Sequence, residues 1–280
     1  MRTRSFLLVA SVLVGCGDKD TETEADTGAV DTAGDTEVEP ASDYASGQHR
    51  VSALVLATDP TVGVDLDGDG EVDNKLPTVL QLAATLTGEP LDVVSLNAVI
   101  ASDIAKGTLI LLTEQGHTDG VLTLDALLGE EADGTLSIDE ASYSTSGEPN
   151  SRFTGAFSSQ TEYAISSERI ELPFPIIVGQ PAVQVPLELV QSSGTVNADS
   201  NTALIGGAVP VDDFMTQVIE PIIPTGEDYD PDAFLGMSRE ELLSFIYDFA
   251  TGETVADIEL SDGRKAVSAA VTYEASAATF

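Results

Sequence analysis

The stretch AVQVPLELV, residues Ala182–Val190, decides the fold class because apolar and polar side chains alternate along it. On an extended chain one face carries Val183, Val185, Leu187 and Leu189, and the other carries Gln184, Pro186 and Glu188. This alternation is typical of a strand in a sheet with one buried face and one wet face. Proline cannot donate a hydrogen bond to a neighbouring strand, so the stretch is predicted to be an edge strand.

Other short apolar runs, bounded by Gly, Pro, Asp or Ser, predict further strands. The clearest are residues 49–57, 107–114, 120–128 and 169–178. The fold class expected from this pattern is α+β and β-rich, a sandwich or partly closed barrel with three or four short helices.

Four segments predict the helices: residues 78–85, 91–105, 212–220 and 237–252. In the last segment, Ser238 and Glu241 have capping-box spacing and Gly252 suits the helix end. Pro221 is expected to stop the third helix. Apolar stripes mark the faces that pack on the sheet: Val93, Leu96, Ile100 and Ile104 in one helix, and Leu242, Phe245, Ile246 and Phe249 in another.

The N-terminus, MRTRSFLLVASVLVGCG, predicts an export signal. Its apolar run, residues 6–14, is too short to span a bilayer. The residues before and including Cys16, Leu-Val-Gly-Cys, resemble the lipobox of bacterial lipoproteins. The resemblance implies a signal peptide over residues 1–15, cleavage before Cys16 and lipidation of its thiol. The alternative is an ordinary signal peptide with an incidental cysteine.

Residues 16–46 are acidic, rich in threonine and almost free of large apolar side chains. Such a segment buries too little surface to fold, so it is predicted to be a disordered tether, or alternatively a segment that recruits cations or a basic partner. Residues 47–280 are predicted to form one β-rich domain. Gly17 beside the lipidated cysteine favours the outer membrane in the familiar Gram-negative sorting pattern. The expected location is therefore the cell envelope, periplasmic or surface-facing.

The chain carries 48 acidic and 11 basic residues, a net charge of −37. Phosphate backbones would be repelled, so no nucleic-acid partner is expected. The acidity fits a calcium-rich surface, a high-salt habitat or a need for solubility, and composition does not separate these. Because Cys16 is the single cysteine, no disulfide or thiolate metal site is expected in the domain.

The stretch VDLDGDGEVDN, residues 64–74, predicts a calcium site. Oxygen ligands on alternate residues followed by glycine suit Ca²⁺, because each skipped residue points away while the chain wraps the ion. The expected ligands are the side chains of Asp65, Asp67, Asp69 and Asp73 and the carbonyl of Glu71. The alternative is an Asp/Gly turn whose carboxylates only accept hydrogen bonds from backbone amides.

This loop resembles the EF-hand family of calcium loops, including DxDxDG relatives found outside helix pairs. It departs from the family at the twelfth position, where Leu76 replaces the bidentate acid. The departure implies weak, extracellular-type affinity of roughly 10⁻⁴ to 10⁻³ M and a shell completed by water or another segment. The auxiliary ligands expected are Asp257, Glu259 and Asp262. A second echo, residues 129–140, is predicted to be a turn into a strand over 135–139.

Together the lipobox, the acidic tether, the aspartate loop and a DIELSDG segment before the last strand resemble a group of Gram-negative surface lipoproteins whose functions are not established. The resemblance implies no catalytic residues. No HExxH, GxSxG or P-loop pattern occurs, so the chain is predicted not to be an enzyme. The function expected is a binding, adhesion or structural module with a protein or polysaccharide partner. The alternative is a carboxylate-dependent hydrolase of the envelope.

Overall fold

The computed structural model describes residues 46–280 apart from 89–90, 176–181 and 253–254. The predicted signal peptide, Cys16 and almost all of the tether lie outside these ranges. All described residues belong to one compact unit. No helix within the described ranges is long and apolar enough to cross a bilayer.

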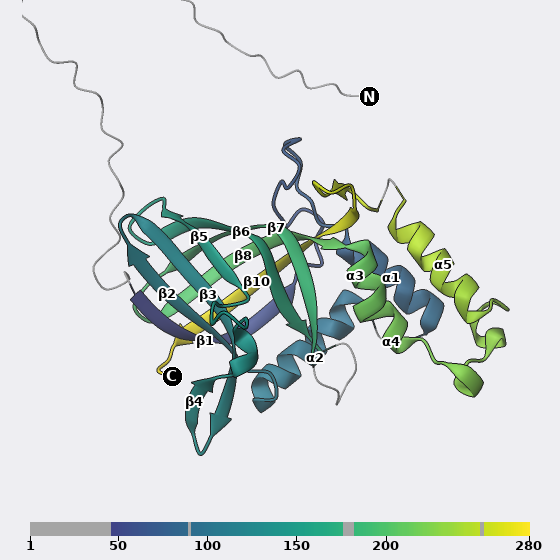
Figure 1. The fold of residues 1–280 in the computed structure, drawn as a ribbon, viewed down its shortest axis with the longest axis horizontal. Helices are drawn as coiled ribbons and strands as arrows, with labels where there is room; N and C mark the ends of the chain where they lie inside the picture. Colours follow the sequence, from purple (N-terminus) through teal and green to yellow (C-terminus); the bar gives the residue numbers. More distant parts are fainter. Residues whose placement is uncertain (1–45, 89–90, 176–181, 253–254) are drawn as a thin grey trace, which may run out of the picture. The chain divides into compact units, whose positions relative to one another are not determined.

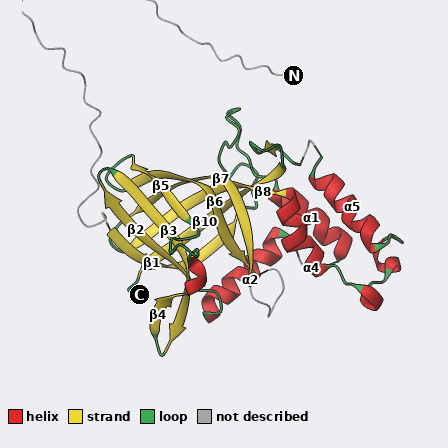
Figure 2. Cartoon of the chain, viewed as in Figure 1, coloured by secondary structure: helices red, strands yellow, loops and turns green. Residues whose placement is uncertain are grey.

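Eight antiparallel strands form a closed barrel in the order β1-β2-β3-β5-β6-β7-β8-β10, and β10 pairs again with β1 (Figures 1 and 2). Their bounds are β1 Ser46–Leu56, β2 Leu111–Thr118, β3 Val121–Ala132, β5 Arg152–Phe157, β6 Glu162–Phe174, β7 Val183–Val196, β8 Ser200–Pro210 and β10 Lys265–Ala277. Two short strands lie outside the ring: β4, Thr135–Ile138, pairs with β3, and β9, Ile258–Glu259, pairs with β10. The β-rich class with helices is confirmed in its barrel form, and the sandwich alternative is wrong because the first and last strands pair and leave a single closed sheet.

The stretch Ala182–Val190 contains the first half of β7, and the structure differs from the prediction in two ways. The prediction of an edge strand is wrong for β7 as a whole, because β7 pairs with both β6 and β8. Pairing with β8 begins only at Glu188, so Pro186 lies where β7 is paired on one side and its missing N–H is tolerated. Leu189 was predicted to face inward, but it has a φ of 53° and is 42% exposed. A bulge between Glu188 and Gln191 inverts the alternation, and Val190 is buried instead.

The barrel interior is filled by large side chains from its strands, among them Leu122, Phe153, Tyr163, Ile170 and Leu187. Polar groups are also buried there. The Tyr163 hydroxyl donates to Asn201 Oδ1 at 2.9 Å and lies 3.1 Å from the Tyr273 hydroxyl. Burial raises the pKa of Tyr163 to about 12, so this network is neutral over the physiological range.

The predicted helices are present: α1 Leu76–Thr87, α2 Val93–Lys106 and α5 Arg239–Ala250, together with a helical run Val211–Ile222 made of α3 Val211–Phe214, the π-helical turn η3 Met215–Ile219 and α4 Glu220–Ile222. The described residues also form the 3₁₀ turns η2 Glu140–Ser142, η4 Gly226–Asp228 and η5 Pro231–Phe234. The helical run ends at Ile222, one residue after Pro221, so the stop predicted at this proline is displaced by a single residue.

Caps and packing fix the helices on the barrel. The capping box of Ser238 and Glu241 forms as predicted, whereas the C-cap residue after Ala250 is Thr251 rather than Gly252. Phe245 departs from the predicted buried stripe and is 48% exposed. Helix α2 lies along β1, where the Asn97 side chain pairs with both the N–H and the carbonyl of Leu56, at 2.8 and 2.9 Å.

Candidate metal centre

The aspartate loop lies between β1 and α1 and is closed at its neck. Val64 and Asp73 form an isolated antiparallel bridge, in which the Asp73 N–H donates to the Val64 carbonyl at 3.0 Å. In Figure 1 the blue loop rises beside the yellow segment that contains β9. The neck fixes the two ends of the loop, so its acidic side chains are confined to a small volume.

The loop is fastened to the outside of the barrel at three points. Leu66 packs on a small apolar cluster formed by Ala208, Ile258, Leu260 and Ala266. Val64 fills the space above Gly206 of β8, where a β-carbon would overlap the Val64 side chain. Gln191 Nε2 donates to the Asp65 carbonyl at 3.5 Å. These contacts couple the geometry of the loop to β7, β8 and β9.

Backbone amides and carboxylates shape the loop. Gly68 and Gly70 have φ values of 81° and 89°, which bend the chain into a left-handed conformation that glycine adopts readily. The Asp65 carboxylate accepts from the N–H groups of Gly68 at 2.7 Å and of Gly70 at 2.9 Å. The turn predicted as the alternative to a metal site is therefore present, but a carboxylate has about four lone pairs and can bind a cation as well.

Asp65, Asp67 and Asp73 form the one group of three or more potential ligand residues in the described part of the chain. One carboxylate oxygen from each lies within 4.8 Å of the others. Calcium binds oxygen at about 2.3–2.6 Å, so two ligands of one ion can be at most about 5 Å apart, and the three oxygens fit a shared ion. Asp69 does not join the group; its carboxylate accepts from the Glu71 N–H at 2.7 Å.

Asp73 is the most enclosed member of the group, 8% exposed, whereas Asp67 is exposed. Burial raises the pKa of Asp73, with further repulsion from Asp257, Asp67 and Asp69, although a hydrogen bond from the Leu66 N–H at 2.7 Å opposes the shift. Keeping the Asp73 carboxylate ionised in the folded chain is therefore unfavourable, and a bound cation would offset the burial and the repulsion.

The three predicted auxiliary residues do not act together. Asp257 is close enough to raise the pKa of Asp73, yet its own carboxylate accepts from the N–H and the hydroxyl of Ser268. Glu259 pairs with Lys265 Nζ at 2.7 Å, and Asp262 pairs with Arg264 Nε at 2.6 Å. Glu259 and Asp262 are thus each paired with a cation, and Asp257 is the one predicted auxiliary residue whose charge contributes to the raised pKa of Asp73.

The echo at residues 129–140 is the β3–β4 hairpin, as predicted. Asp133 and Gly134 form its turn with φ values of 52° and 77°. The acids of this segment do not belong to the aspartate group.

Sequence patterns did not reveal a cavity inside the barrel, because the residues that line it come from β1, β2, β3, β6 and other distant segments. Thr113, Ser142 and Ser151, which are buried around it, have no motif in common. Comparison with protein-family models, curated proteins and solved structures finds no match to this chain.

Proposed function

We propose that this chain is a lipid-anchored protein of the cell envelope whose barrel is fastened by one calcium ion and serves as a binding, adhesion or structural module. The convergence of Asp65, Asp67 and Asp73 on one point carries the metal part of this proposal. Ca²⁺ suits the site better than Mg²⁺, because it accepts irregular carboxylate shells at about 2.3–2.6 Å and needs no ideal octahedron. The Glu71 carbonyl and water would complete the shell.

The place of the ion suggests a clip rather than a switch. The loop contacts β8 through Val64 and the β9 region through Leu66, so an ion inside it would stiffen a connection between existing elements. The chain enters from a strand and leaves into α1, not from one helix to another. A helix pair that opens on calcium binding is not available in this arrangement.

The envelope part of the proposal rests on the lipobox-like residues before Cys16 and on the acidic segment that follows. A lipid chain contributes about 0.8 kcal/mol per buried CH₂, so two or more chains hold a protein on a membrane without a spanning helix. The proposed location is the outer membrane, with a protein or polysaccharide as partner.

No observation favours the hydrolase alternative. A carboxylate-dependent hydrolase needs two acids facing each other in a cleft. Among the described residues that line the barrel cavity, Glu171 is the one carboxylate. That the chain is not an enzyme stays a prediction.

Isothermal titration of the full chain with CaCl₂ tests the metal proposal. We expect one site with a Kd of roughly 10⁻⁴ to 10⁻³ M. Asp67→Asn should weaken binding at least about tenfold, because the neutral amide is a poorer ligand. The control is Asp199→Asn, which makes the same charge change at an exposed position far along the chain and should bind like the natural protein. Equal binding by both variants, or no calcium heat, would refute the site.

A further inference from the structure

The barrel wall is incomplete on one side. β3 pairs with β5 only over Leu122–Asp125, and the second half of β6, from Arg169, pairs with β7 alone. We call the gap between residues 126–128 of β3 and 169–172 of β6 the side seam. It is covered by residues 140–151, which include η2 but no strand of the barrel.

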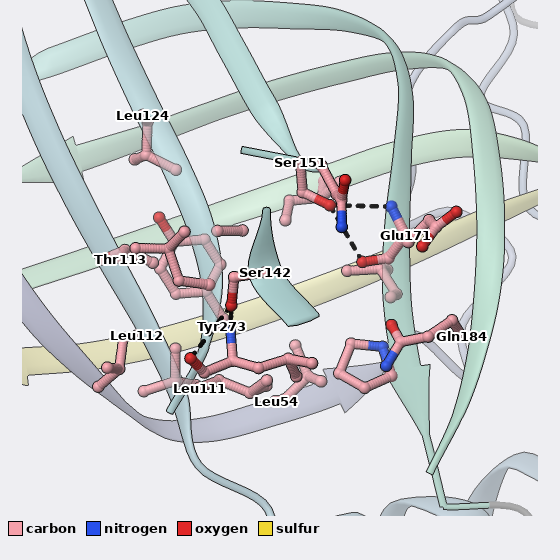
Figure 3. A pocket seen from close by; sticks show the side chains of 18 of the residues that line it. Leu54, Leu111, Leu112, Thr113, Leu124, Ser142, Ser151, Glu171, Gln184 and Tyr273 are labelled. Carbon is pink, nitrogen blue, oxygen red and sulfur yellow. Dashed lines mark hydrogen bonds between the residues drawn. The ribbon is translucent and has the colours of Figure 1, made fainter. Parts of the chain in front are cut away.

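Two serine hydroxyls close the side seam. Ser142 Oγ accepts from the Leu128 N–H at 2.8 Å and donates to the Leu128 carbonyl at 3.2 Å. Ser151 Oγ does the same for Glu171, at 2.9 and 3.2 Å. Each hydroxyl thus takes the place of a missing strand partner, and Figure 3 shows both pairs at the cavity. Two backbone bonds also join β3 to the covering segment, from the Ala126 N–H to the Ser151 carbonyl at 2.9 Å and from the Asp139 N–H to the Leu128 carbonyl at 3.0 Å. These bonds are still fewer than in a continuous ladder, so the closure opens more easily.

A cavity of about 110 Å³ lies directly behind the side seam. In Figure 3, Leu124, Thr113 and Tyr273 lie on one side of it, and Ser151, Glu171 and Gln184 on the other. Its apolar lining includes Leu54, Leu111, Leu124, Phe153 and Ile205. A cavity of about 150 Å³ lined by such residues holds a benzene ring, so this one suits a group of about six carbon atoms at most.

One polar group in the lining lacks a partner. Thr113 is 3% exposed, lines the cavity, and its Oγ1 makes no hydrogen bond with any described residue. Leaving a buried hydroxyl unpaired is unfavourable, and a bound water needs two to four polar partners, which a mainly apolar cavity does not supply. The unpaired hydroxyl therefore favours a ligand with one hydrogen-bonding group beside Thr113 Oγ1.

The charges around the cavity further restrict the class of ligand. The described residues that line the cavity include no lysine, arginine or histidine, but they include Glu171. With a net charge of −37 on the chain, a carboxylate or phosphate ligand would be repelled. The ligand class is neutral.

We propose that this cavity binds a small neutral alcohol, whose ring or alkyl group lies among Leu111, Leu124 and Phe153 while its hydroxyl pairs with Thr113. The ligand enters through the side seam when the Ser142 and Ser151 hydrogen bonds open. This inference goes beyond the calcium clip and does not depend on it, since the cavity lining contains none of the loop aspartates.

Cyclopentanol, cyclopentane and cyclopentanecarboxylate share one ring and stay within six carbon atoms, so they are matched probes for the full chain, with affinity measured by ligand-observed NMR titration. We expect saturable binding of cyclopentanol and at least tenfold weaker binding of cyclopentanecarboxylate. Thr113→Val, which keeps the shape but removes the hydroxyl, should weaken the binding of cyclopentanol about fivefold and leave the binding of cyclopentane unchanged. Equal losses for both neutral probes, or none for cyclopentanol, would overturn the role of Thr113.

Filling the cavity tests its location. Leu124→Phe places a larger ring in the lining and should abolish binding of both neutral probes. Val121→Phe adds the same ring at a 47% exposed position of the same strand and should bind like the natural protein. Thermal melts and amide spectra show whether each variant is folded. If Leu124→Phe is unfolded, Leu124→Met supplies the test through altered affinity for cyclopentane relative to the natural protein.

Opening of the side seam has its own readout. Ser142→Ala with Ser151→Ala should speed probe exchange, seen as sharper averaging of the NMR lines, while affinity changes less than the exchange rate. Unchanged exchange would refute the route. If neither neutral probe binds the folded natural chain at millimolar concentration, the cavity is not a binding site for neutral ligands and the proposal is wrong; the calcium titration is unaffected by that outcome.

Discussion

The ionised side chain of Asp73 destabilises the fold that holds it in place. Burial and neighbouring carboxylates raise its pKa, so the folded chain favours the protonated form. Ionisation therefore costs stability once the pH exceeds the ordinary value of 3.8, and the full cost applies above the raised pKa. In calcium-free buffer at pH 7, we expect Asp73→Asn to raise the free energy of unfolding by roughly 0.5 kcal/mol, because the amide carbonyl still accepts from Leu66.

Urea unfolding with and without calcium measures this effect. At 5 mM calcium and a Kd near 10⁻⁴ M, binding adds about 2 kcal/mol to the natural protein and nothing to the variant, so the order of stability should reverse. The stabilising effect of the substitution in calcium-free buffer should fade as the pH falls toward 3.8. A variant that is less stable than the natural protein in calcium-free buffer at pH 7 would contradict the charge argument.

At the level of elements, local sequence patterns predicted most strands and helices. They did not predict the irregularities that arise where an element contacts a segment distant in sequence. The bulge after Glu188 is an example. The Glu188 carboxylate accepts from Arg264 Nη2 at 2.8 and 3.0 Å, a residue 76 positions away. Alternation within AVQVPLELV does not depend on that distant partner, so it wrongly predicts that Leu189 faces inward. The aspartate loop was predictable because its ligands and its glycines are adjacent in sequence, whereas the cavity was not.

The contact between the loop and β8 depends on a glycine. A methyl group on Gly206 would overlap Val64, so Gly206→Ala should push the loop from the barrel and weaken calcium binding about tenfold. Val64→Ala in the same chain removes the obstructing methyl groups and should restore most of the affinity. Isothermal titration of the two single variants and the double variant measures the coupling. If the two effects simply add, the loop does not rely on this contact.

At the scale of the molecule, closure of the barrel could not be read from the sequence. It depends on β1 meeting β10, as in the pairing of His49 with Ala277, which joins the two ends of the domain. Local alternation is the same in an open sheet, a sandwich and a barrel, so only the pairing of distant edges distinguishes them. Once β1 and β10 pair, the ring has no free edge between them.

The net charge of −37 gives a last prediction, which separates general salt effects from the calcium site. Screening weakens repulsion among all exposed acids, so NaCl should raise the melting temperature of the natural chain and of Asp73→Asn equally. Millimolar calcium at constant ionic strength should raise the melting temperature of the natural chain only, because that effect requires the converging carboxylates of Asp65, Asp67 and Asp73. Differential scanning calorimetry in 0.1 and 1 M NaCl, each with calcium or magnesium, measures both responses. Salt adaptation alone would explain the acidity if NaCl stabilises both chains and calcium adds no more than magnesium.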